Sequence, residues 1–174
     1  MSWLFSRRLT GPDGGALYAA IVAETRRADW YRAARVPDSI DGRFAILSTL
    51  MALADIRLGK GGEAAKAVAP RLAERFIDDM DVQMREAGFS DAGLGKQVRM
   101  MVGSLASRVE RWQVAVERNA EDLGGAWDEA VVPSLYRDSP PDEAAVEAGS
   151  LMVRDWWQRL SGASDEDLAE GRVP

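Results

Sequence analysis

Three carboxylates, Asp78, Asp79 and Asp81, are the sharpest candidates for chemistry in this sequence. Carboxylates clustered on a helix can hold Mg²⁺, an ion that orients and activates diphosphate groups. The cluster lacks the gap that usually separates such ligands, and we find no second acidic motif to face it. Two other interpretations therefore stand beside a magnesium site: a solvated acidic stretch with a helix ion pair, and a surface that recognises a partner.

The composition excludes several classes of enzyme. The chain has 174 residues and contains neither histidine nor cysteine. Catalysis by Ser-His-Asp or Cys-His groups is therefore impossible, and so are thiolate metal sites and disulfides. We expect no catalytic residue, no cofactor and no metal ligand.

The acidic cluster lies on a strongly periodic segment. Leu72, Phe76, Met80 and Met84 recur every four residues, which predicts one buried face of a helix over about 63–87. Gly88 is expected to end that helix in the left-handed conformation. A second helix should follow over about 92–121, with Lys96 near its start.

The rest of the chain predicts an all-α fold: a single compact domain of about six helices. We expect further helices near 16–28, 40–58, 126–135 and 139–160, and a short one within 29–35. The helix at 40–58 is apolar on nearly all sides and should be central. Pro70 should kink or restart the helix that contains it. We divide the chain into a flexible arm at 1–14, the helical domain at 15–160 and a frayed acidic tail at 161–174.

Charge and hydropathy limit the partners. The net charge is −6, and residues 120–174 carry thirteen acidic side chains against four basic ones. We therefore expect no specific nucleic-acid partner. No apolar run reaches the ~20 residues that span a bilayer. We expect a cytoplasmic protein, with a peripheral place at the inner membrane as an option. Trp3, Leu4 and Phe5, followed by Arg7 and Arg8, would suit an anionic membrane surface.

Three blocks of the sequence resemble the ubiquinol-cytochrome c chaperone family. The first contains Leu17-Tyr18 and Ile21-Val22, and the second runs from Val36 to Phe44. The third holds Asp78-Asp79-Met80-Asp81, Arg85-Glu86-Ala87-Gly88, Ser90-Asp91, Gly95-Lys96 and Met100-Met101. The joint spacing of these blocks makes the resemblance more specific than any one block would be.

The resemblance implies a non-enzymatic assembly chaperone of the cytochrome bc1 complex. Its client would be newly made cytochrome b, or another bc1 subunit. Transient contact with a membrane surface or a ribosome is a further implication. The rival hypothesis is a magnesium-dependent enzyme that acts on a diphosphate or a lipid through Asp78, Asp79 and Asp81.

The second and third blocks should share one role, so we expect the fold to bring them together. Arg43 and Phe44 should approach the segment from Asp78 to Lys96, and Arg43 should pair with one of its carboxylates. The residues expected to bind a partner are Arg43, Phe44, Asp78, Asp79, Met80, Asp81, Met84, Arg85, Lys96, Met100 and Met101.

Overall fold

The computed structural model describes residues 14–86, 88, 91–118, 125–137 and 139–174. These residues form eight α-helices and no strand, which confirms the predicted all-α class. The helices are α1 (Gly15–Thr25), α2 (Asp29–Arg32), α3 (Ile40–Gly59), α4 (Glu63–Glu86), α5 (Asp91–Arg118), α6 (Gly125–Leu135), α7 (Glu143–Gly162) and α8 (Asp165–Ala169). The expected arm lies outside the described residues except for Gly14.

Helix α3 is the centre of the fold, as its apolar surface predicts. It packs against α1, α4, α5, α6 and α7. Its start is defined by Ser39, whose side-chain oxygen accepts a hydrogen bond from the Gly42 amide at 3.1 Å. Such a cap satisfies one of the amides that the first turn leaves without a helical partner.

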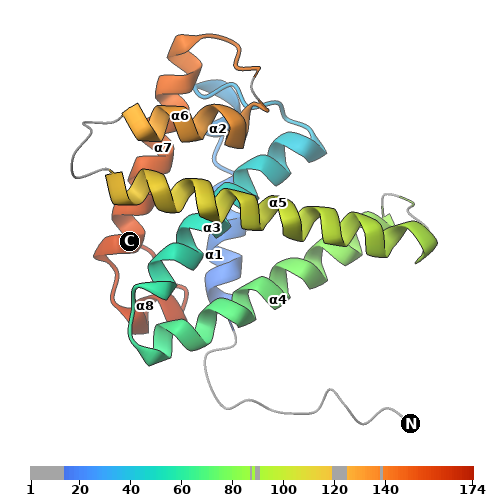
Figure 1. Ribbon diagram of the computed structural model, residues 1–174, viewed down its shortest axis with the longest axis vertical. Coiled ribbons are helices and arrows are strands. Elements are labelled where there is room, and N and C mark those ends of the chain that lie inside the picture. The colour runs from blue at the N-terminus through green and yellow to red at the C-terminus, as the bar shows by residue number, and fades with distance from the viewer. Residues whose placement is uncertain (1–13, 87, 89–90, 119–124, 138) are drawn as a thin grey trace.

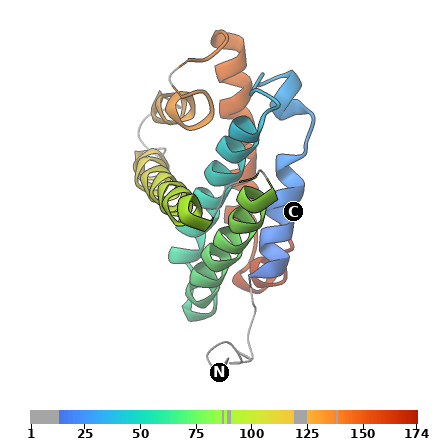
Figure 2. The same ribbon diagram turned by 90° about the vertical axis from the view of Figure 1, so that its right-hand side faces the viewer.

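Helices α4 and α5 extend beyond the rest of the bundle and meet at their turn (Figure 1). Gly88 in this turn has a φ of +86°, which confirms the predicted left-handed residue. Helix α4 continues through Pro70 as one helix, so of the two predicted outcomes, a kink or a restart, the restart does not occur. Pro70 is exposed, and the carbonyl that it leaves without a donor can be hydrated. The view at right angles shows α5 beside α3 and α4 (Figure 2).

The C-terminal segment differs from the expected frayed tail. Residues 165–169 form α8, which packs against α4 and α1. Leu168 is fully buried there. Ser164 caps the helix by accepting a hydrogen bond from the Asp167 amide at 3.1 Å. The acidic composition concealed this element, because one buried leucine among three acidic residues produces no periodic pattern.

Candidate functional site

A large groove lies between the first two helices, the start of α3 and the end of α4. Its volume is about 780 Å³. We call it the methionine groove, because Met80 and Met84 of α4 and Met101 of α5 line it. All three predicted family blocks contribute to its walls, through Val22, Phe44 and the methionines. The fold thus brings sequence-distant segments to one surface, as expected.

Six of the eleven predicted binding residues line this groove: Arg43, Phe44, Asp79, Met80, Met84 and Met101. The other five do not. Asp78 and Lys96 are exposed elsewhere on their helices. Asp81 accepts a hydrogen bond from Arg85 at 2.8 Å, in a pair one helical turn apart. Met100 lines a different cavity, between α5 and α6.

Arg43 does not pair with the acidic cluster, so this part of the prediction is wrong. Its guanidinium binds Asp38, with Nε donating to Oδ1 at 2.8 Å. This hydrogen bond, together with the carboxylate charge, raises the pKa of Arg43. Asp38 lies in the loop immediately before α3, which makes it a closer partner than the carboxylates of α4. The pair is exposed and forms part of the groove's charged rim.

The three carboxylates of α4 do not converge on a common point. The Tyr18 hydroxyl of α1 donates to Asp79 Oδ2 at 2.6 Å, and Gln83 donates to the same oxygen at 2.9 Å. Asp81 is engaged by Arg85. Within the described part of the chain, no group of three His, Cys, Asp or Glu side chains could hold a metal ion. The magnesium hypothesis therefore gains no support from the geometry.

The bond from Tyr18 fixes the groove wall. Burial raises the pKa of the Tyr18 hydroxyl well above its usual range, and the hydrogen bond to Asp79 and the charge of Asp79 raise it further. The hydroxyl therefore stays protonated and keeps donating. This contact joins α1 to α4 across 61 positions of sequence.

Phe44 forms an inner wall of the groove. Its ring centroid lies 6.1 Å from that of Phe76, which is buried in the core. The Arg108 guanidinium of α5 lies 5.8 Å from the centre of the Phe44 ring, within the range of a cation–π contact. Phe76 and Arg108 therefore hold the Phe44 ring in place from two sides.

Sequence reasoning missed several residues of the groove, of which Ile40 is the most informative. Ile40 begins α3 and keeps 66 % of its surface exposed, although it is a large apolar residue. Tyr31 of α2 also lines the groove, and Arg26 and Arg32 extend its basic rim. The sequence did offer a signal for Ile40: it is an apolar residue in the first turn of a helix, but it lies outside the buried stripe of that helix.

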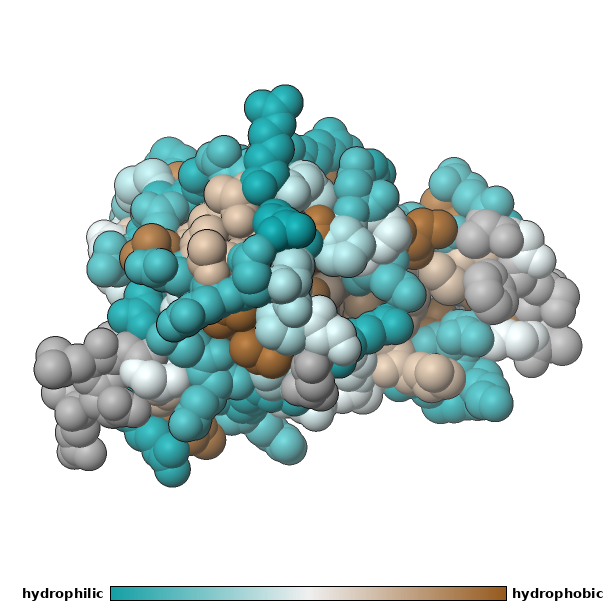
Figure 3. All heavy atoms as spheres, turned by 90° about the horizontal axis from the view of Figure 1, so that it is seen from above, coloured by the Kyte–Doolittle hydropathy of each residue, from teal (hydrophilic) through white to brown (hydrophobic). Residues whose placement is uncertain are grey.

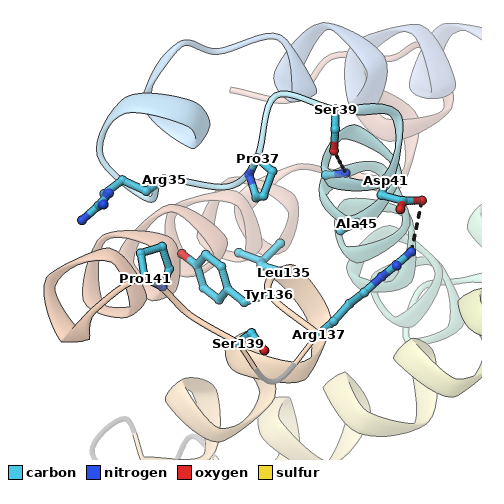
Figure 4. Close-up of a pocket in the computed structure, with 11 residues that line it drawn as sticks. Arg35, Pro37, Ser39, Asp41, Ala45, Leu135, Tyr136, Arg137, Ser139 and Pro141 are labelled. Carbon is cyan, nitrogen blue, oxygen red and sulfur yellow. Dashed lines mark hydrogen bonds and ion pairs between the residues drawn. The ribbon is translucent and has the colours of Figure 1, made fainter.

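A smaller cavity of about 250 Å³ lies on the other side of the α2–α3 loop (Figure 4). Arg137 points toward Asp41 at 3.1 Å, and Arg35 points away from the cavity. The Tyr136 oxygen lies 2.6 Å from the Ala34 carbonyl and 2.8 Å from the Ala145 carbonyl. Burial, followed by the charge of Asp142, raises the pKa of Tyr136 to about 12. These groups are engaged in joining the α2–α3 loop to α6 and α7.

Seen from above, the surface is largely hydrophilic, with smaller hydrophobic areas, and the α4–α5 end projects to the right (Figure 3). The structure contains no helix, among the residues it describes, that is long and apolar enough to cross a membrane. The fold and the methionine groove together define the class of this protein. It is an all-α protein with an open, partly apolar groove that is suited to binding another molecule.

Comparison with known proteins then identifies the family. Residues 32–173 match the family described as ubiquinol-cytochrome C chaperone. The chain is also similar to a solved structure, the crystal structure of the Cbp3 homolog from Brucella abortus, with 28 % identity and a TM-score of 0.77. That similarity covers 92 % of this chain and 87 % of the other. No curated protein matches. The chain belongs to the ubiquinol-cytochrome c chaperone family, and it is a chaperone rather than an enzyme.

Proposed function

We propose that this protein assists assembly of the cytochrome bc1 complex by holding newly made cytochrome b, and that the methionine groove receives an apolar segment of that client. Membership of the chaperone family supports the assembly role. One observation supports the site above all others: the blocks at 36–44 and 78–101, distant in sequence, both line this groove.

The side chains of the groove suit an apolar client. Methionine is flexible and polarisable, so surfaces that accept varied apolar partners use it heavily. Met80 and Met84 lie deep in the groove, Met101 is half-buried, and Ile40 stands exposed at the edge. A client segment would first contact Ile40 and then Phe44 and the methionines.

The rim of the groove carries charges of both signs. Arg26, Arg32 and Arg43 supply the cations, and Asp38 and Glu86 are the nearby acids. Charges around an apolar contact contribute more to orientation and selectivity than to affinity. The rim would therefore position the polar ends of the client segment. This role involves no bond making or breaking.

Ile40→Glu tests this proposal. Ile40 is exposed and occupies the first position of α3, where a carboxylate is compatible with the helix dipole. The variant should therefore melt like the wild type, yet it places a charge where the apolar client would dock. We expect capture of cytochrome b from detergent-solubilised membranes to fall by at least about tenfold, because a charge unpaired in an apolar contact is costly.

Leu151→Glu is the matched control. Leu151 is another large apolar residue with high exposure, 61 %, and it lies on α7, outside the groove. It should leave capture unchanged. A photo-reactive residue at position 40, but not at 151, should cross-link to cytochrome b. Full capture by a folded Ile40→Glu variant, with no cross-link from position 40, would remove the groove from the mechanism.

A further inference from the structure

A third cavity, of about 430 Å³, lies between α5 and the end of α6. Three arginines line it, Arg108, Arg111 and Arg137, together with Ser104 and Ser107. Its lining includes no carboxylate among the residues that the structure describes. The cavity therefore gathers hydrogen-bond donors and positive charge in a protein whose net charge is negative.

Arg108 is the unusual member of this set, because only 8 % of its surface is exposed. Its Nη2 donates to the Ser134 carbonyl at 3.0 Å, and its Nη1 donates to the Ser104 side chain and carbonyl. Its Nε is buried and has no partner within the described residues. Oxygen atoms of neutral groups thus solvate this cation, and no carboxylate in that part of the chain forms an ion pair with it. A buried charge without a counter-charge is costly.

The neighbours increase the positive potential at Arg108. Arg111 donates from Nη1 to the Ser134 hydroxyl at 3.2 Å, so its charge is also solvated by a neutral oxygen. Arg137 pairs with Asp41 at 3.1 Å, at the exposed rim. Within the described part of the chain, Asp41 is therefore the carboxylate that pairs with this set of arginines, and it binds Arg137 alone. Burial, followed by repulsion from Arg111 and Arg137, lowers the pKa of Arg108 to about 10, which leaves it charged at neutral pH.

We propose that this cavity is a binding site for a phosphate-type oxyanion, either free phosphate or the phosphomonoester headgroup of a lipid. Guanidinium groups match the geometry of phosphate oxygens and bind them through paired hydrogen bonds. The arginines and the two serine hydroxyls have more hydrogen-bond donors than the single carboxylate of Asp41 could accept. Exposed Met100 and half-buried Pro133, which also line the cavity, would face the substituent of an ester. The site is separate from the methionine groove and does not depend on the client proposed above.

Calorimetric titration with inorganic phosphate, at constant ionic strength and neutral pH, tests the site directly. We expect saturable binding of one phosphate per chain. Arg111→Gln removes one charged donor that is partly exposed, so the variant should fold and bind phosphate at least about tenfold more weakly. Arg108→Met keeps the length of the side chain, removes the buried charge and should abolish binding.

Arg118→Gln is the matched control, since it makes the same charge change at an exposed position of the same helix, outside the cavity. It should retain the wild-type affinity within about twofold, because a distant exposed charge is screened at physiological salt. If Arg108→Met fails to fold, Arg111→Gln alone still decides the test.

Vesicles distinguish the two sources of the phosphate group. Flotation would compare phosphatidylcholine vesicles that contain phosphatidic acid with vesicles that contain an equal charge of phosphatidylserine. A preference for phosphatidic acid that Arg111→Gln removes would assign a lipid headgroup, and binding of inorganic phosphate alone would assign a soluble ligand. The proposal is overturned if neither phosphate nor phosphatidic acid binds, or if Arg118→Gln weakens binding as much as Arg111→Gln.

Discussion

At the scale of single residues, the contact between Tyr18 and Asp79 does the most to shape the candidate site. The sequence placed both residues within blocks of the same family resemblance, but it gave no reason to pair them. The structure joins them at 2.6 Å, with the tyrosine as donor. Asp79 is thereby turned toward α1 and forms part of the groove wall, whereas Asp78 and Asp81 do not line the groove.

Tyr18→Phe should lower the free energy of unfolding by about 1–2 kcal/mol, because it leaves a half-buried carboxylate without one of its donors. Urea denaturation at pH 8 would measure this difference. Capture of cytochrome b should also weaken if the position of α4 matters to the groove. An unchanged denaturation midpoint would show that Gln83 alone suffices to hold Asp79.

The Tyr18 hydroxyl also predicts that the stability of the protein depends on pH in the alkaline range. Its pKa is raised in the folded state, and the ordinary value of 10.0 applies to the unfolded chain. The contribution of Tyr18 to the free energy of unfolding is therefore complete below about pH 10. Above that pH the contribution falls by about 1.4 kcal/mol per pH unit. The stability difference between wild type and Tyr18→Phe should shrink between pH 10 and 11 and stay constant between pH 7 and 9. A constant difference over the whole range would contradict the protonated donor.

At the scale of elements, the turn between α4 and α5 depends on Gly88. Its positive φ is unfavourable for a residue with a Cβ atom, whereas the space around that Cβ is open. Gly88→Ala should therefore destabilise by about 1 kcal/mol through the backbone alone. Gly103 lies in the interior of α5, also with open space around it. Gly103→Ala should stabilise by about 0.5–1 kcal/mol, because alanine favours the helix.

Chemical denaturation of the two glycine variants separates conformation from packing. Opposite signs are expected, although both variants add the same methyl group to the same pair of helices. Destabilisation of similar size at both positions would mean that the added volume, rather than the left-handed backbone, is what the fold rejects.

Most helices could be predicted from the sequence because their periods are long and their ends carry recognisable signals, such as Gly88 after α4. The components of the groove could be named for the same reason, since Met80 and Met84 lie on one face of α4. The partner of Arg43 could not be predicted, because several carboxylates were within plausible reach and only the path of the α2–α3 loop selects Asp38. The sequence carries a similarly weak signal for the packing of a short helix such as α8.

At the scale of the whole molecule, α3 connects the two candidate binding sites. Phe44 of α3 lines the methionine groove, and its ring contacts Arg108, which lines the cavity between α5 and α6. A ligand that draws the Arg108 guanidinium toward the cavity would alter this contact. The two sites are therefore adjacent through one cation–π pair, although they open between different helices.

The opposite end of α3 is fastened to the C-terminal segment by Arg57. Its Nη1 donates to Asp165 at 2.9 Å, and its Nη2 donates to the Ala163 carbonyl at 2.7 Å. Asp165 also accepts a hydrogen bond from the Gly62 amide at 2.8 Å. This hydrogen bond, followed by the one from Arg57, lowers the pKa of Asp165. Residues 163–169 are thus bound to the end of α3 and to the start of the α4 segment, and we infer that they belong to the helical domain.

Leu168→Ala tests that inference, because Leu168 is the fully buried side chain of α8. Removing it leaves a cavity among α8, α4 and α1 and should cost about 2–5 kcal/mol. Leu151→Ala makes the same chemical change at an exposed site and should cost no more than about 0.5 kcal/mol. A frayed tail would give no loss for either variant in urea denaturation. Because α8 packs on α4, whose far end forms part of the groove wall, this packing connects the C-terminal segment to the helix that carries the candidate site.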